Sequence, residues 1–301
     1  MNSPVLFLIF KREDVTRRVF ERICEAKPPR LYIAADGPRP NHPDETAKCE
    51  ATRKVVERVD WPCEIHRLYR NTNLGCGRGV SSAITWFFEH EEQGIIIEDD
   101  ILPHIDFFRY CDEMLERYKD NERVQLISGY NYFFEDFPSD VSYYMSSYMH
   151  IWGWASWRRV WKTYQFDLNK YPKSKMQEMI RKRLCAKSAR YFLWIYSKML
   201  QMEIDTWDYQ LSFNQYYYDR YSICPYINMV ENIGMGSKEA THTTNEDSRI
   251  SGHKARSPYP IKHPQVFYTS SVSDNIDMMN NGQVRDNLIV RLIKRIYNKL
   301  S

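Results

Sequence analysis

The first third of the chain alternates short apolar runs with helical patterns, and this rhythm limits the fold more than any other feature. Buried strands are predicted at PVLFLIF (4–10), RLYIAAD (30–36) and GIIIEDD (94–100), with a further strand at CEIHRLY. Helical spacing occurs between them in EDVTRRVFERICEA, in a charged segment at about 44–59 and in VSSAITWFFEHEE. The alternation predicts an α/β fold with a mostly parallel central sheet flanked by helices.

The pattern after residue 103 is less regular. We expect a helix at 104–119, a strand and loop at RVQLISGYNYF, helices at about 173–203 and 208–219, and a strand closing into a glycine loop at ICPYINMVENIGMG. Residues 236–283 are polar and are predicted to be loop-like. The sequence has no internal repeat, so we expect one domain (1–244, with halves of about 1–103 and 104–244) followed by a tail (245–301).

Bulk composition excludes several classes of protein. The net charge of +3 argues against a general nucleic-acid binder. Seven cysteines, an odd number without a C-x-x-C pair, argue against a disulfide framework or a zinc site and indicate a reducing compartment. No apolar run has the length of a membrane span, and MNSPVLFLIFKRED lacks the basic region of a signal peptide. We therefore expect a soluble, cytoplasmic protein.

Three carboxylates, Glu98, Asp99 and Asp100, follow directly after the apolar run of the strand predicted at 94–100. Adjacent like charges repel one another, and burial raises the cost. A divalent cation would relieve the repulsion, and Mg²⁺ and Mn²⁺ both prefer oxygen ligands. The alternative is a solvated turn with an acidic helix cap. Ligands in open α/β sheets bind at the carboxyl ends of strands, where Asp36 also lies.

The segment IIIEDDILPHIDFFRY resembles the metal-binding DxD region of glycosyltransferases with the GT-A (Rossmann-like) fold, including the N-glycan N-acetylglucosaminyltransferase that starts hybrid branches. PVLFLIFKRED, NLGCGRG, IWGWASWRRVW, DTWDYQL and NIGMGSKEATHT occur in the order seen in bacterial nucleotide-diphospho-sugar transferases, over roughly residues 4–244. The resemblance implies a metal-dependent, inverting glycosyltransferase that uses a nucleotide-sugar, with UDP as the expected nucleotide. The acceptor would be a glycan, in some cases lipid-linked, in surface polysaccharide biosynthesis.

The same resemblance implies roles on the donor side. Phe10 and Arg12 would border the nucleotide base, and Asp36 would accept a hydrogen bond from it. The remaining implied roles belong to the carboxylate cluster: Glu98 and Asp99 would face the ribose and the base side, and Asp100 would ligate Mn²⁺ or Mg²⁺. For Asp36-Gly37-Pro38, a simple turn is the alternative.

The glycine turn NLGCGRG is not a dinucleotide G-x-G-x-x-G, because Val80 stands at the third glycine position. Small residues before a helix could let backbone amides approach a phosphate, and Arg78 could pair with the diphosphate. A helix start that needs flexible dihedral angles is the alternative. No P-loop pattern occurs in the sequence.

Two segments of the second half could contribute to the acceptor side. In WGWASW, the resemblance places Trp152, Gly153 and Trp154 beside the donor sugar and the acceptor, whereas Trp157 and Trp161 have the spacing of core residues. In EIDTWDYQL, Asp208 falls in the first turn of a helix, where the helix dipole favours an ionised acid.

A general base must be ionised to accept a proton, and the resemblance assigns that role to Asp208, with Asp205 in reserve. Acids in a first helical turn are also common for stability alone. His242 corresponds to a histidine that reaches the metal or the diphosphate in similar enzymes, although a lone loop histidine is commonly just solvated. His150 is a weaker candidate.

The segment VRDNLIVRLIKRIYNKL (284–300) predicts a basic amphipathic helix. Such a helix could lie on the inner face of the plasma membrane, or it could pack against the domain or a second subunit. Two other functions remain open. A nucleotidyltransferase that makes nucleotide sugars would show a Gly-rich basic signature after the first strand, where this chain has KREDVTRR. A sugar-binding module would use the tryptophans without needing Asp36 or Asp100.

Overall fold

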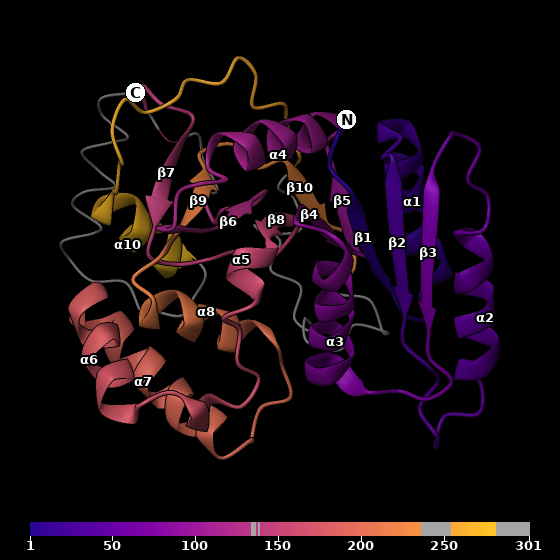
Figure 1. Ribbon diagram of the computed structural model, residues 1–301, viewed down its shortest axis with the longest axis horizontal. Helices are drawn as coiled ribbons and strands as arrows, with labels where there is room; N and C mark the ends of the chain where they lie inside the picture. Colours follow the sequence, from indigo (N-terminus) through magenta and orange to yellow (C-terminus); the bar gives the residue numbers. More distant parts are fainter. Residues whose placement is uncertain (134–136, 138, 236–253, 281–301) are drawn as a thin grey trace.

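The computed structural model describes residues 1–133, 137, 139–235 and 254–280. An eight-stranded sheet with the order β3-β2-β1-β4-β8-β6-β9-β7 runs through the molecule (Figure 1). Its first four strands in space, β3 (Glu64–Tyr69), β2 (Arg30–Ala35), β1 (Val5–Ile9) and β4 (Gln93–Glu98), are all parallel. This arrangement confirms the predicted α/β fold class.

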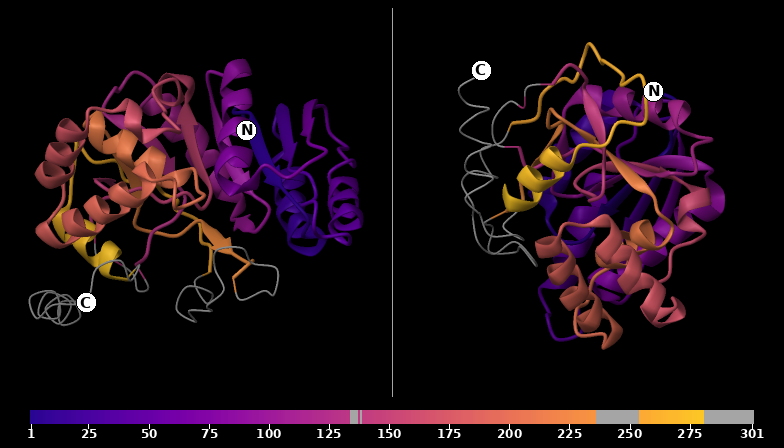
Figure 2. Two further views of the ribbon diagram at one scale, coloured as in Figure 1. Left: turned by 90° about the horizontal axis from the view of Figure 1, so that it is seen from below. Right: turned by 90° about the vertical axis from the view of Figure 1, so that its left-hand side faces the viewer.

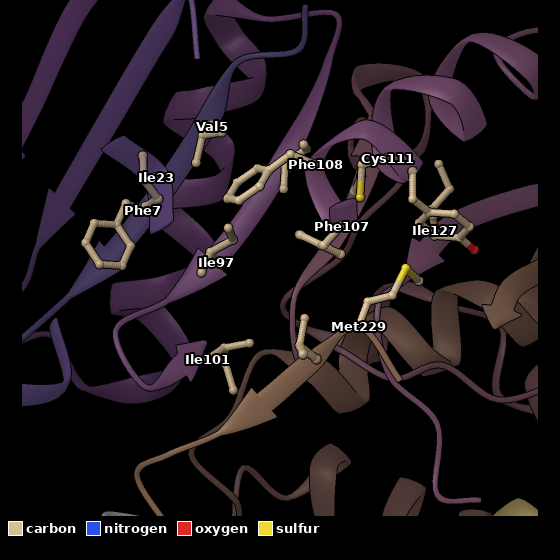
Figure 3. Packing of buried hydrophobic residues seen from close by; sticks show 14 of the residues in the cluster. Val5, Phe7, Ile23, Ile97, Ile101, Phe107, Phe108, Cys111, Ile127 and Met229 are labelled. Atoms are coloured by element: carbon tan, nitrogen blue, oxygen red, sulfur yellow. The ribbon is translucent and has the colours of Figure 1, made fainter. Parts of the chain in front are cut away.

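Strand β1 is buried along its whole length because helices cover both faces of the sheet. Alternate side chains of a strand point to opposite faces. Val5, Phe7 and Ile9 therefore pack in one hydrophobic cluster, with α1 (Glu13–Ala26) and α4 (Ile105–Arg117). Figure 3 shows Val5 and Phe7 in this cluster, with Ile23 of α1 and Phe108 of α4. Leu6 and Leu8 pack in another, with α3 (Gly75–His90). Helix α2 (Glu45–Val55) lies beside α1, at the β3 side of the sheet (Figure 1).

The second half of the sheet contains antiparallel neighbours. Strand β8 (Trp154–Trp157) lies antiparallel between β4 and β6 (Val124–Ser128), β9 (Tyr221–Pro225) runs parallel to β6, and β7 (Tyr143–Ser146) is the antiparallel edge strand. A separate ribbon pairs β5 (Ile101–Pro103) with β10 (Val230–Asn232). The remaining elements are α5 (Arg158–Trp161), a 3-10 turn at Leu168–Lys170, α6 (Lys173–Arg183), α7 (Ala186–Leu200) and α8 (Asp208–Tyr217).

The polar segment predicted as loop contains a helix, α10 (Ser271–Asn280). Its composition hid it, because Asp277 and Ser273 are buried polar residues that find partners in the domain. Asp277 accepts a hydrogen bond of 2.7 Å from the Tyr132 N–H and pairs with His150 Nε2 at 2.6 Å. Helix α10 therefore packs on the half of the molecule that contains β7 and β9 (Figure 2, right). The predicted helix at 284–300 and His242 lie outside the described residues.

All seven cysteines are free thiols. In the part of the chain that the structure describes, we find no helix with the length and apolar character needed to cross a membrane.

Candidate active site

A cavity of about 520 Å³ opens at the carboxyl ends of β1, β2 and β4. Parallel strands end at the same edge of a sheet, so residues that are distant in the sequence meet there. The loop before α8 contributes residues of the second half of the chain to the same cavity. Nine residues predicted for the site line it: Phe10, Arg12, Asp36, Glu98, Asp99, Asp100, Trp152, Asp205 and Asp208.

Asp36 follows β2 and is half-buried beneath the start of α3. Its carboxylate accepts hydrogen bonds from the Leu74 N–H at 3.0 Å and from the Gly37 N–H at 2.9 Å. Burial raises the pKa of Asp36, although these N–H groups oppose the shift. The carboxylate thus joins the end of β2 to the N-terminus of α3 at the wall of the cavity.

Arg12 binds the carboxylate cluster. Its Nη2 lies 3.0 Å from Asp100 Oδ2 and also donates a hydrogen bond to Asp99 Oδ1. The Phe10 N–H donates to Asp99 Oδ2 at 3.3 Å, so both oxygens of the buried Asp99 have partners within the chain. Asp99 therefore anchors the segment after β1, and Arg12 makes these contacts through Nη2.

Glu98 has no hydrogen-bond or ion-pair partner within the described residues, although its carboxylate lines the cavity. Burial raises the pKa of Glu98, and the charges of Asp100 and Asp99 raise it further. Burial also raises the pKa of Asp99, against the lowering effect of Arg12. One guanidinium thus faces three carboxylates, which leaves an excess of negative charge in a partly dry site.

This donor set fits a hard divalent cation. The ligands would be Glu98 and Asp100, because carboxylate oxygens suit Mg²⁺ and Mn²⁺ and both oxygens of Asp99 are already engaged. A cation bound there would neutralise charge that develops on a leaving diphosphate.

Asp205 and Asp208 approach from the loop between α7 and α8. Asp205 Oδ1 accepts a hydrogen bond of 3.0 Å from the Gly77 N–H. A Cβ atom at Gly77 would lie 2.5 Å from that oxygen, and one at Gly75 would lie 2.7 Å from Oδ2, so the glycines permit the close approach. Gly75 also has φ +79°, which favours glycine.

Asp208 is the first residue of α8. Its Oδ1 accepts hydrogen bonds from the Tyr209 N–H at 2.8 Å and from the Thr206 hydroxyl. Within the described residues Oδ2 has no hydrogen-bond partner, and the residue lines the cavity. One oxygen therefore fixes the carboxylate while the other is available to a ligand.

Three predicted site residues do not line the cavity. Arg78 is exposed and stacks on the Phe166 ring, 4.8 Å from its centroid. Trp154 is 1% exposed and stacks on Trp207 at 5.6 Å, because β8 pairs with β4 and turns this side chain into the core. Gly153 is buried against Val230.

Trp154 thus lies in the core, and Arg78 lies outside the cavity lining, so their predicted contacts with a sugar and a diphosphate stay predictions. Trp152 does line the cavity and packs on the Tyr130 ring at 4.5 Å. His150 lies apart from the cavity lining, and its Nε2 is hydrogen-bonded to the buried Asp277 at 2.6 Å, near Cys224. Because Asp277 is already bonded to His150 and to Tyr132, this trio is a satisfied polar cluster.

Sequence reasoning missed several residues of the cavity wall, including Lys11, Arg39 and Arg70. Lys11 Nζ lies 2.7 Å from Glu45 Oε1, and Arg39 Nε donates to the same oxygen at 3.0 Å. Hydrogen bonding from Arg39 lowers the pKa of the buried Glu45 carboxyl. These residues lie in loops or just before a helix, where the sequence has no periodic pattern from which their position could be predicted.

No protein-family model matches the chain, and no curated protein does. Among solved structures, HddC from Yersinia pseudotuberculosis is 12% identical, with 57% of this chain and 86% of that one covered at a TM-score of 0.34. UDP-glucose pyrophosphorylase complexed with UDP-glucose is 10% identical over 54% of this chain and 79% of that one, with a TM-score of 0.33. The likeness to these proteins is partial, and no conclusion about the reaction rests on it. The resemblance to GT-A glycosyltransferases is not confirmed by these comparisons.

Proposed function

We propose that the cavity binds a nucleotide-diphospho-sugar and that the enzyme transfers the sugar to a hydroxyl group of a glycan. The observation that carries the proposal is the convergence of acids with separate tasks on one cavity. Asp36 and the Glu98–Asp100 cluster stand at strand ends, and Asp208 lines the same cavity from the start of α8. Such an arrangement suits a donor held at one wall and an acceptor activated at the other.

The donor wall supports binding of a nucleotide, with UDP as the first candidate. Phe10 offers a ring surface and Asp36 an acceptor for a base N–H. The diphosphate would lie near Glu98 and Asp100, where its negative charge requires Mn²⁺ or Mg²⁺. His242 is a further proposed ligand of the cation, and it lies outside the described residues.

The acceptor wall supports general-base catalysis by Asp208. The free Oδ2 would take the proton of the acceptor hydroxyl as its oxygen attacks the anomeric carbon and the bond to the diphosphate breaks. Thr206 and the Tyr209 N–H hold the carboxylate in position. Asp205 is already bonded to Gly77, so it serves the architecture of the cavity more than proton transfer. Direct displacement of this kind inverts the anomeric configuration.

Nucleotidyl transfer, which makes a nucleotide sugar, is the second candidate. Lys11, Arg12 and Arg39 surround the exit from β1, where a triphosphate would need cations. Each of them is already paired, Lys11 and Arg39 with Glu45 and Arg12 with the carboxylate cluster. The pairing of Lys11 and Arg39 favours the glycosyltransferase, because a triphosphate bound by these two residues would have to compete with Glu45.

Titration calorimetry with UDP, GDP, dTDP and CDP, each with Mn²⁺ and with EDTA, tests the donor site. We expect one nucleotide to bind in the presence of metal only, and Asp100→Ala to abolish this binding. Asp106→Ala is the matched control, because Asp106 is a nearby aspartate in the first turn of α4 that does not line the cavity. Binding of no nucleotide under any condition would exclude both candidate reactions and leave a sugar-binding module to be tested with free glycans.

Activity measurements then separate the two reactions. Asp208→Asn should retain metal-dependent nucleotide binding and lower kcat for sugar transfer by about 10²–10⁴-fold. Release of pyrophosphate from a nucleoside triphosphate and a sugar 1-phosphate would instead identify a nucleotidyltransferase. We also propose that the acceptor is lipid-linked and that residues 284–300 contact the membrane. Neither proposal is tested by these measurements.

A further inference from the structure

The segment that contains α6 and α7 concentrates positive charge. Between residues 170 and 198 the sequence has nine lysines and arginines against a single acid, Glu178. The whole chain has a net charge of only +3, so the rest of the molecule is net acidic. The two helices pack on each other and project at the end of the molecule away from β3 and α2 (Figure 1; Figure 2, left).

Most of these cations face solvent. Lys173, Arg181, Lys182 and Arg190 are exposed, and no ion pair of theirs is seen within the described residues. Arg183 differs, because its side chain is 3% exposed and pairs with Asp219 at 2.7 Å. Neighbouring like charges repel one another, and no ion pair within the described residues offsets that repulsion for these exposed members.

An aromatic residue stands in the middle of the charge on α7. Trp194 is 56% exposed, and it lies four residues from Arg190 on one side and from Lys198 on the other, so the three share one face of the helix. Met202, just after the helix, is 55% exposed. A large exposed indole among cationic side chains is typical of helices that lie in a lipid interface, where the ring enters the headgroup region and the charges meet anionic lipids.

We propose that the surface formed by Lys173, Arg181, Lys182, Arg190 and Trp194, the α6–α7 face, docks on an anionic phospholipid bilayer. The charge complements acidic headgroups, and Trp194 with Met202 supplies apolar area that a soluble polyanion would leave unused. The loop that follows α7 carries Asp205 and Asp208 into the cavity, so docking would bring the acceptor wall close to the lipid surface. Lipid binding itself requires neither metal nor sugar transfer.

Flotation of the full-length protein with vesicles tests the proposal. The vesicles contain phosphatidylcholine alone or phosphatidylcholine with about one third phosphatidylglycerol, at low and at high salt. We expect binding to the anionic vesicles only, and weaker binding at high salt. Arg181→Glu with Lys182→Glu should weaken binding at least tenfold, because each basic residue near the surface contributes about 1 kcal/mol.

Controls separate this face from the rest of the chain. Lys54→Glu with Arg58→Glu makes the same charge change on exposed residues at the other end of the molecule and should leave binding unchanged. Trp194→Ala should weaken binding, and Trp194→Phe should restore most of it. Equal binding by the two charge-reversed proteins would place the contact elsewhere, for example in 284–300, and would overturn the proposal. Binding to heparin without binding to vesicles would overturn it too.

Discussion

Arg12 offers the sharpest test of how the carboxylate cluster is neutralised. Its guanidinium lies 3.0 Å from Asp100 and also contacts Asp99, so within the described residues Arg12 is the basic side chain that pairs with the carboxylate cluster. Burial lowers the pKa of Arg12, but Asp99 and Asp100 outweigh burial and raise it. A divalent cation that binds Asp100 must therefore displace or share this guanidinium. Removal of the Arg12 charge should strengthen metal binding.

The size of the effect follows from the geometry. At 3.0 Å and an effective dielectric constant of 20, the attraction between Arg12 and Asp100 is about 5 kcal/mol before desolvation is subtracted. Loss of one partner from a buried pair costs about 3–5 kcal/mol. The Arg12 side chain is 18% exposed, so we expect Arg12→Met to lose about 3 kcal/mol of unfolding free energy in EDTA. Mn²⁺ at one hundred times its Kd should restore about 2.7 kcal/mol.

Urea unfolding with EDTA and with Mn²⁺, together with calorimetric titration of Mn²⁺, measures both effects. Arg17→Met is the matched control, because Arg17 forms an exposed i,i+4 pair with Glu13 and should change stability by no more than about 0.5 kcal/mol. If Arg12→Met binds Mn²⁺ more weakly than the wild type, the guanidinium and the metal do not compete for the same carboxylates. The reasoning would then be refuted.

Two further predictions concern the second half of the molecule. Burial raises the pKa of Asp274 to about 7 in the folded protein, above its value in the unfolded chain. The contribution of Asp274 to stability is therefore complete below about pH 4 and is lost as the pH rises through 7. Urea unfolding should show that the unfolding free energy is about 2–3 kcal/mol lower at pH 8 than at pH 5 because of this group. Asp274→Asn should abolish this difference, whereas Asp140→Asn, at an exposed position, should leave it unchanged. Trp154→Ala should lower the unfolding free energy by about 3–5 kcal/mol. Trp152→Ala should mainly weaken substrate binding, and the opposite pattern would contradict the assignment of the two rings.

The fold of the first half followed from local patterns. Apolar runs and helical spacing are properties of a few neighbouring residues, so β1, β2 and β4 with α1 and α3 lie where the sequence predicts them. Helix α10 escaped prediction because its buried residues mix polar with apolar side chains. The contacts of Asp274 and Asp277 are made with partners more than a hundred residues away in the sequence. The spacing of residues along the sequence gives no information about partners that are so distant.

The site divides in the same way. Acids at strand ends could be placed at one cavity because parallel strands end together. The tryptophans could not be separated by spacing alone. Gly153 has φ +60°, which breaks the extended run between Trp152 and Trp154, so one ring lines the cavity and the other enters the core. The side-chain direction of Arg78 is likewise a matter of packing against Phe166.

The glycine turn bears on how the proposed diphosphate would be bound in the cavity. The first N–H groups of a helix are free to bind phosphate, but three of those at the start of α3 already donate to side chains of this chain. Asp36 accepts the Leu74 N–H, Asn73 Oδ1 accepts the Gly75 N–H, and Asp205 accepts the Gly77 N–H. The two carboxylates come from different halves of the chain, so the turn serves to hold the halves together. A diphosphate in this cavity would consequently meet acids at the helix start, and its positive partners would be the basic side chains of the other walls or a metal at Asp100.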